Sequence, residues 1–362
     1  MKNLLILIVL TVVFRSGGSC SGEDVTQQPC IVRVLVLNFD PIVSENQERM
    51  HKVCDWNSPK ELADGYISDV NESSRSFIKY QITEWRDLDE FPVKADGFRY
   101  SVQSYFDCRE GKRKWHEPDL ADYPRFLEDH RALEMVTADQ IGEVWLFGGP
   151  YFGFHESSMV GPKAFYINGG VYDKVGVRRR FAVMGYNYER GVAEMLHNLS
   201  HRTESTMSRV FGGWKFDELT SDWARFAANL KQSGTAAVGS CHYPPNGEKD
   251  YDYANPRLVE SSAVDWLKYP ELSGATSRVS CETWGGPDYH RNYMKWWFKH
   301  LPHKPRLNPL NRKRNNWWKY VFEMSADWAE ERRVINLHRV GSQRLHAGFF
   351  GLSLHHRVRE GL

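Results

Sequence analysis

Four ionisable side chains follow one another at helical spacing near the middle of the chain. Glu194, His197, His201 and Glu204 are separated by three, four and three residues. On an α-helix this spacing places all four side chains in one stripe. Two histidines one turn apart on the same face form a chelating pair for zinc or a similar divalent ion. The stripe is therefore the first candidate for a metal-dependent site.

The stripe also contains candidates for the remaining roles of such a site. We expect His197 and His201 to bind the ion, with Glu204, His242 or Glu194 as the third ligand. A catalytic site leaves one coordination position for water, and the ion lowers the pKa of that water. A carboxylate that does not bind the ion then acts as general base. Glu194 and Glu204 are the candidate catalytic residues, and Glu194 is the preferred base.

The stripe differs from a known metallopeptidase pattern, and it has a simpler structural interpretation. Asn198 stands where the His-Glu-x-x-His motif has its glutamate, so a peptidase of that type is not supported. The simpler interpretation is a solvated helix face whose ion pairs contribute about 0.2–0.5 kcal/mol each. Two features favour the site: the face has paired histidines but no lysine, and the long loops that follow it can cover it.

Further candidates lie in turns and loops near the expected strand ends. The candidate substrate-binding residues are His155, Glu156, Glu189, Arg190, Asp252 and Trp284. Each has a structural alternative. A His-Glu pair in a loop commonly lies at the surface, Glu189 complements the positive end of a helix, and tryptophans are more often buried in the core. Asp250 and Asp252 lack the spacing of an EF-hand calcium loop.

The segments before the stripe alternate between strand and helix patterns. Their order predicts an α/β fold with a mostly parallel central sheet flanked by helices. In such sheets, sites gather beyond the carboxyl ends of the strands, where Asp40, residues 148–156 and residues 187–190 are expected. The predicted strands are residues 31–39, 80–85, 143–147, 164–168 and 181–184, and the predicted helices are residues 59–80, 123–136 and 188–211.

The helix that contains the stripe is expected over residues 188–211. Asn187 is its predicted N-cap, and Gly212-Gly213 is its predicted end. The helix is amphipathic, and the face opposite the stripe is predicted to pack on the core. That apolar face consists of Val192, Leu196, Leu199, Thr203, Met207 and Val210.

The C-terminal half is predicted to be rich in loops and helical. Helices are expected over residues 217–231, 258–269 and 289–300, and residues 240–256 form a long loop because they are rich in Pro, Gly, Asn and Asp. We expect residues 21–320 to form a single α/β domain, with residues 321–362 as a C-terminal extension.

The first residues are typical of an export signal. Leu4 to Phe14 is an apolar run of signal-peptide length, and small residues precede Cys20, as in a bacterial lipoprotein cleavage box, although Gly17 replaces its usual leucine. Residues 1–20 are therefore a predicted signal peptide. The mature protein is expected to be exported, as a cell-envelope lipoprotein with a lipid on Cys20 or as a secreted protein. No later run of the sequence has the length and apolarity of a transmembrane helix.

Charge, cysteine content and the known motifs limit the function classes. The formal net charge of +1 argues against a general nucleic-acid binder. No glycine-rich phosphate loop, nucleophile elbow or dinucleotide fingerprint occurs in the sequence. An oxidising compartment permits disulfides. Besides Cys20 the sequence has five cysteines, and the first candidate pair among them is Cys241 with Cys281. The five are Cys30, Cys54, Cys108, Cys241 and Cys281.

Several longer motifs resemble those of a group of uncharacterised exported bacterial proteins and lipoproteins. They are EVWLFGGP at 143–150, NYERGVAEMLH at 187–197, HRTES at 201–205, CHYPPN at 241–246 and NNWWKY at 315–320. The resemblance extends from about Ile31 to Tyr320 and implies export and one continuous domain. The group has no established activity, so the resemblance implies no reaction.

These observations favour an exported metal-dependent hydrolase with zinc as the expected ion. Its expected substrate is an extracellular polymer, either a glycan or a peptide, or a small molecule. Two alternatives remain. One is a metal-free glycan-active protein that uses a carboxylate pair among Glu194, Glu204, Glu156 and Asp252, with tryptophans lining its groove. The other is a surface lipoprotein without catalysis.

Overall fold

The computed structural model describes residues 27–213 and 218–324. The predicted signal peptide, Cys20 and residues 325–362 lie outside the described residues. The domain boundary predicted after Tyr320 falls inside a helix, α12 (Trp318–Phe322), whose last residues are buried. Within the described part of the chain, no helix combines the length and apolarity needed to cross a bilayer.

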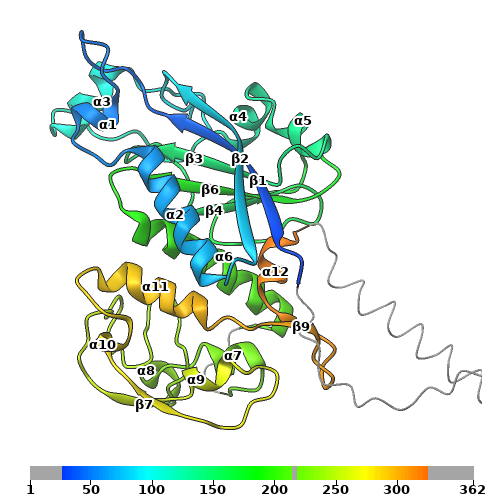
Figure 1. Cartoon of the computed structure of the whole chain (residues 1–362). Coiled ribbons are helices and arrows are strands. Elements are labelled where there is room, and N and C mark those ends of the chain that lie inside the picture. The colour runs from blue at the N-terminus through cyan, green and yellow to red at the C-terminus, as the bar shows by residue number, and fades with distance from the viewer. Residues whose placement is uncertain (1–26, 214–217, 325–362) are drawn as a thin grey trace, which may run out of the picture.

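A six-stranded, mostly parallel sheet forms the centre of the α/β fold (Figure 1). Its order is β2-β1-β3-β6-β4-β5, and β4 is antiparallel to β6. The central strands β1, β3 and β6 are almost wholly buried, as apolar runs covered on both faces require. The strands are β1 (Cys30–Phe39), β2 (Ile78–Leu88), β3 (Glu143–Gly148), β4 (Ser157–Val160), β5 (Val171–Tyr172) and β6 (Phe181–Asn187).

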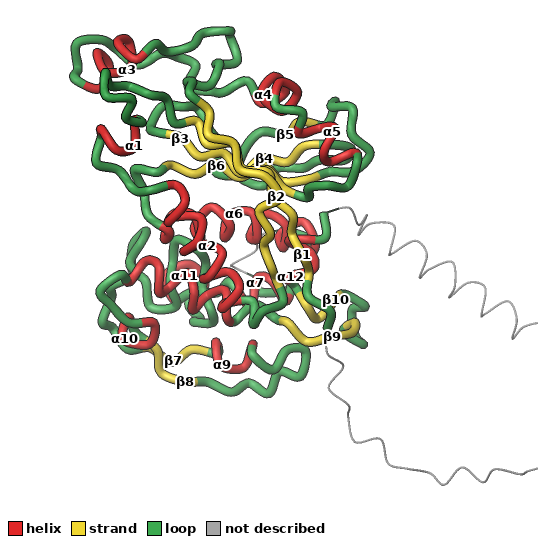
Figure 2. The backbone as a smooth tube through the Cα atoms, turned by 45° about the horizontal axis from the view of Figure 1, so that its top comes forward, coloured by secondary structure: helices red, strands yellow, loops and turns green. Residues whose placement is uncertain are grey.

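Helices lie on both faces of the sheet (Figures 1 and 2). On one face, α6 packs against α2, α11 and α12. On the other face lie α4 and α5, with α1 and α3 beyond the end of the sheet. These helices are α1 (Met50–Val53), α2 (Pro59–Ser73), α3 (Val102–Arg109), α4 (Tyr123–Asp129), α5 (Ala132–Thr137), α6 (Val192–Phe211) and α11 (Tyr289–Lys299).

Some predicted boundaries were wrong, for local reasons. The helix predicted over residues 59–80 ends at Ser73, because Arg75 and Ser76 adopt positive φ before β2 begins. The helix predicted over residues 123–136 is divided into α4 and α5 by Arg131, which is left-handed. Residues 164–168 form no strand, and the sheet is extended instead by the short strands β4 and β5.

The C-terminal half is rich in loops, but the structure does not confirm a mainly helical half. Residues 240–256 form the expected loop, and α11 agrees with the predicted helix. The helix predicted over residues 217–231 is replaced by α7 (Asp222–Phe226) and α8 (Leu230–Ser233), and the one predicted over residues 258–269 by β7 (Val259–Ser261) and α9 (Ala263–Trp266). The other elements of this half are α10 (Cys281–Trp284), β8 (Ser277–Val279), which pairs with β7, and the two-stranded sheet of β9 (His303–Leu307) and β10 (Arg314–Asn316).

The proposed disulfide between Cys241 and Cys281 is not present. All five cysteines of the described residues have free thiols. Cys241 instead donates its thiol hydrogen bond to Glu204 at 3.0 Å, so its sulfur is directed toward α6.

Ion pairs join α2 to α11 beside the stripe. Asp69 accepts from Arg291 at 2.6 Å, and Glu72 accepts from Lys295 and Lys299 at 2.7 and 2.6 Å. These bonds lower the pKa of Glu72 to about 2. A carboxylate whose pKa is lower in the folded state than in the unfolded state stabilises the fold at pH values above its unfolded pKa, ~4.3. This contribution is lost as the pH falls through the folded pKa.

Glu72→Gln should therefore destabilise the protein in a pH-dependent manner. We expect a loss of about 0.5–1 kcal/mol at pH 7, because both pairs are partly exposed. The difference from wild type should narrow as the pH falls from about 4.5 to about 2. Urea unfolding across this range measures it, and Asp64→Asn, an exposed carboxylate on the same helix, is the control. An equal loss at neutral and acidic pH would exclude the ion-pair explanation.

Candidate metal centre

The helix α6 presents the stripe, and its ends are defined by local hydrogen bonds. It begins at Val192 rather than at Tyr188, because Asn187 is still the last residue of β6. The side chain of Glu194 accepts a hydrogen bond from the backbone N–H of Gly191 at 3.1 Å and so caps the first turn. Gly212, at φ +95°, ends the helix as predicted.

The apolar face of α6 is covered, and the opposite face is covered in part. The predicted apolar face is buried, as expected. The amide of Asn198, beside His197, donates to the carbonyl of Gly185 in β6 at 2.7 Å and joins the helix to the sheet. The opposite face is only partly solvated: His197 and Glu204 are each 6% exposed, whereas Glu194 and His201 are partly exposed. The interpretation of the stripe as a solvated helix face was therefore wrong for His197 and Glu204.

The loop of residues 240–256 folds back over the stripe because α11 binds its start. The hydroxyl of Tyr293 donates to the carbonyl of Ser240 at 2.8 Å, and the indole N–H of Trp297 donates to the carbonyl of Gly239 at 2.9 Å. The hydroxyl of Tyr253 closes the loop on the carbonyl of Cys241 at 2.6 Å. These bonds hold His242 against α6.

Three imidazole nitrogens converge above α6. The Nε2 atoms of His197 and His201 are 3.0 Å apart, and each lies 3.2 Å from Nε2 of His242. A triangle of this size fits one face of a zinc tetrahedron, because Zn–N bonds of ~2.05 Å place ligand atoms about 3.3 Å apart. His197, His201, Cys241 and His242 form a group that could hold a metal ion.

Hydrogen bonding among the rings cannot satisfy this triangle. Each Nε2 atom either carries one hydrogen or offers one lone pair. One N–H···N bond can satisfy two of the three atoms, and the third then faces an atom of its own kind or remains unpaired. The third atom then depends on a neighbour outside the triangle, the Tyr251 hydroxyl near His242 or the Glu156 carboxylate near His201. A shared cation satisfies all three atoms at once, since all three lone pairs can point at it.

The outer nitrogens of the three rings also have polar neighbours. His242 Nδ1 lies 3.1 Å from a carboxylate oxygen of Asp250, and His201 Nδ1 lies 3.5 Å from Glu204. His197 Nδ1 lies 3.4 Å from Nε2 of His290, whose own Nδ1 lies 3.9 Å from Glu194. Carboxylates behind histidine ligands fix their tautomer and orientation.

Glu204 and Cys241 lie behind His201 rather than on the face where the three Nε2 atoms meet. Glu204 accepts from the backbone N–H of Cys241 at 2.8 Å as well as from its thiol. Burial and the charge of Glu204 raise the pKa of Cys241 well above its ordinary value. The sulfur is 4.0 Å from His201 Nε2. The three imidazoles therefore form a tighter ligand set than any set that includes the thiol.

The pKa values of the two helix histidines shift in opposite directions. Burial, together with His201, His242 and His290, lowers the pKa of His197 to about 2. His197 is therefore neutral, and one of its two ring nitrogens has a lone pair. Burial also lowers the pKa of His201, but its hydrogen bond to Glu204 and the charges of Glu204 and Glu156 outweigh burial, so that its pKa is raised.

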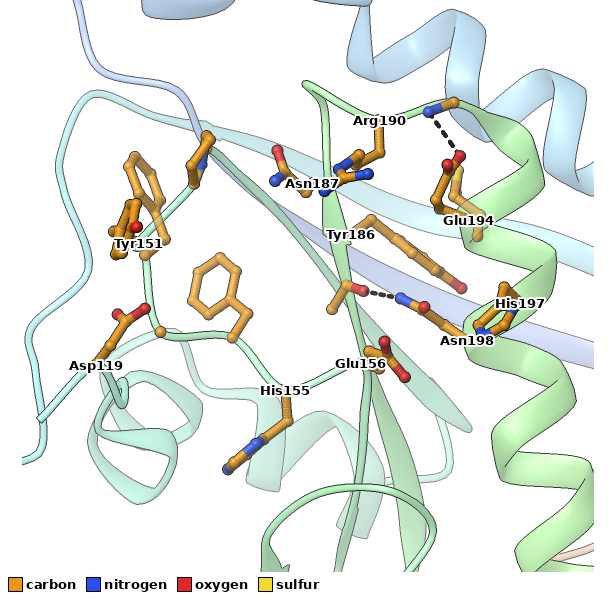
Figure 3. Close-up of a pocket in the computed structure, with 18 of the residues that line it drawn as sticks. Asp119, Tyr151, His155, Glu156, Tyr186, Asn187, Arg190, Glu194, His197 and Asn198 are labelled. Carbon is orange, nitrogen blue, oxygen red and sulfur yellow. Dashed lines mark hydrogen bonds between the residues drawn. The ribbon is translucent and has the colours of Figure 1, made fainter. Parts of the chain in front are cut away.

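A cavity of about 670 Å³ opens beside the triangle (Figure 3). Its volume is within the range of small-molecule sites, about 300–1,000 Å³. His197 lies at one end, where its ring contacts the rings of Tyr251 and His290, which also line the cavity. Glu156 points toward His197 from the strand side. Glu156 lies 3.7 Å from His201 Nε2, and the hydroxyl of Tyr251 lies 3.3 Å from His242 Nε2. Both groups therefore lie near the three nitrogens.

The structure brings some predicted site residues together and separates others. Glu156, Arg190 and Glu194 line the cavity, as does His155, whose ring points away from the stripe. Burial lowers the pKa of His155.

Three other predicted site residues do not line the cavity. Trp284 is a core residue that donates to the carbonyl of Tyr253, Asp252 accepts from Glu248 N and Asn255 within its own loop, and Glu189 is exposed.

Sequence reasoning missed His290, Cys241 and Tyr251 as members of the centre. His290 is far along the chain and comes close only because α11 packs on α6. Cys241 directly precedes His242, and Tyr251 lies between Asp250 and Asp252, so their positions beside these residues were the available signal.

Comparison of the chain with protein-family models, curated proteins and solved structures finds no match.

Proposed function

We propose that this protein is a metal-dependent hydrolase whose ion, preferably zinc, is bound by His197, His201 and His242. The triangle of three Nε2 atoms is the single observation that supports it most. Three neutral nitrogen ligands and one open position are typical of catalytic zinc. The adjoining cavity gives a substrate access to that position.

The side chains beside the triangle have the chemistry that hydrolysis requires. A bound ion would supply a water of lowered pKa and would polarise the scissile carbonyl. Glu156 is the general base in this proposal, because its carboxylate lies nearest the face of the triangle. The Tyr251 hydroxyl is placed to donate a hydrogen bond to the oxyanion that forms.

Glu194, the base preferred from the sequence, has a different position. It caps α6 at Gly191 and faces His290, which in turn faces His197. Glu204 likewise faces His201 from behind. In this proposal both carboxylates position ligands, and neither touches the reacting water.

The location and the substrate size are also proposals. The apolar run after the N-terminal Met-Lys-Asn and the small residues before Cys20 support export, with a lipid anchor on Cys20 as one form. An exported hydrolase with an open cavity is suited to an extracellular polymer. The near-neutral net charge supports a substrate other than nucleic acid.

Glu156→Gln should abolish most of the hydrolysis and leave the metal in place. We expect kcat for the chromogenic ester p-nitrophenyl acetate to fall by about 10²-fold or more, since the amide cannot accept the proton. Metal content by mass spectrometry should stay at the wild-type level. Glu260→Gln, an exposed carboxylate on β7, is the control and should hydrolyse the ester normally. Wild-type kcat in Glu156→Gln would rule out this base.

A further inference from the structure

At the far end of the cavity from His197, Tyr151 and Asp119 form a second cluster (Figure 3). Neither residue takes part in the metal centre. Tyr151 is 42% exposed although it is a large aromatic residue. Its ring is stacked on Trp115, with the centroids 3.9 Å apart and the planes 8° from parallel. One face of the tyrosine is therefore supported, and the side chain lines the cavity.

The backbone holds Tyr151 in a conformation that tyrosine rarely adopts. Its φ is +60°, in the left-handed region, where a bulky side chain is strained. The carbonyl of Tyr151 accepts from the ammonium of Lys94 at 2.7 Å, and Lys94 is fully buried. A strained backbone that is held by a buried charge indicates that the position of this ring matters.

The same lysine fixes Asp119. Lys94 Nζ donates to its carboxylate as well as to the carbonyl of Tyr151. The two segments are joined again two residues further on, where the N–H of Ala121 donates to the carbonyl of Gly153 at 2.9 Å. Gly153 permits this contact, because a Cβ there would lie 2.6 Å from the nitrogen of Ala121. The exposed ring and the carboxylate thus form one rigid unit.

We propose that this unit is a carbohydrate subsite in which a sugar ring stacks on Tyr151 and Asp119 accepts hydrogen bonds from its hydroxyl groups. The proposal rests on the proposed function and names the substrate class of the same cavity: a glycan that carries an ester or amide group, whose carbonyl would be attacked at the metal centre. A flat aromatic face suits the C–H face of a pyranose, and a fixed carboxylate suits its equatorial hydroxyls. Further along the cavity, Asn187 and Arg190 offer donors to the next residues of a glycan.

A peptide substrate is less well served by this cavity. Extended peptides commonly add a strand to a sheet edge. The edge strands of the central sheet are β2 and β5, and neither contributes a residue to the lining of the cavity. The lining consists mainly of aromatic faces, carboxylates and amides. The geometry therefore favours a glycan over an extended peptide.

Calorimetric titration of the full chain tests the subsite. The probes are cellohexaose, chitohexaose, mannohexaose and hexagalacturonate, with a random decapeptide mixture as comparison. We expect at least one hexasaccharide to bind the wild type and to bind Tyr151→Ala at least tenfold more weakly. Tyr151→Phe keeps the ring and the same φ, so it should bind like the wild type. Near-UV circular dichroism verifies that each variant is folded.

Three results would overturn the carbohydrate subsite. They are absence of binding by all four hexasaccharides, unchanged affinity in folded Tyr151→Ala, and binding of the decapeptides alone. Metal content measured on the same samples separates the two proposals. Protein that takes up no metal when zinc is added, yet binds a hexasaccharide through Tyr151, would contradict the metal-dependent hydrolase and leave the subsite standing.

Discussion

Replacing both His197 and His201 with alanine should release the metal ion from the purified protein. Two of the three converging Nε2 atoms are then missing, and His242 alone cannot retain an ion. Removing only a residue behind a ligand typically weakens metal binding 10–100-fold, and loss of two ligands should exceed that. Elemental analysis should find about one equivalent of metal in the wild type and almost none in the double variant.

The control for this experiment is a histidine outside the centre. His116 pairs with Asp96 and stacks on Phe98, and His116→Ala should keep its metal. Far-UV circular dichroism establishes that the double variant is folded. A folded double variant that retained a full equivalent of metal would place the ion elsewhere and remove the basis of the proposed reaction.

Arg202→Met should cause a large loss of stability. Arg202 and Glu143 are each about 1% exposed, and the guanidinium donates to the carboxylate at 2.6 Å. The guanidinium also donates to the carbonyl of Val321 at 2.9 Å, which ties α12 to α6. Removing it leaves the carboxylate of Glu143 buried, and among the described residues its hydrogen-bond donors are then the neutral Trp145 and Tyr80. We expect a loss of about 3–5 kcal/mol in urea unfolding.

A second substitution separates the charge from the packing. In Arg202→Met with Glu143→Gln the buried charge is gone, so a large part of the lost stability should return. Equal instability of the single and double variants would show that packing dominates. Because Arg202 follows His201 on α6, its ion pair with β3 also fixes the rotation of the helix that presents the metal ligands.

The sequence was sufficient for the features that depend on local patterns. The apolar runs predicted the three central strands, because strands covered on both faces contain little else. The spacing of Val192, Leu196 and Leu199 predicted the buried face of α6, and Gly212 predicted its end. The pair His197 and His201 was visible for the same reason, since one turn of helix separates them.

The remaining features depend on tertiary contacts that no local pattern encodes. His290 approaches His197 only because α11 packs across α6. Glu156 faces the centre because β4 runs antiparallel to β6, and that strand was not predicted. The role of Trp284 was misjudged because exposure of a tryptophan cannot be read from its neighbours in sequence. The division of the helix at Arg131 reflects one left-handed residue that is not glycine.

X-ray diffraction recorded on both sides of the zinc absorption edge tests the central claim most directly. The account predicts one anomalous peak, about 2.0–2.1 Å from the Nε2 atoms of His197, His201 and His242. Absence of such a peak from crystals grown with added zinc, with the three rings bound to water instead, would contradict it.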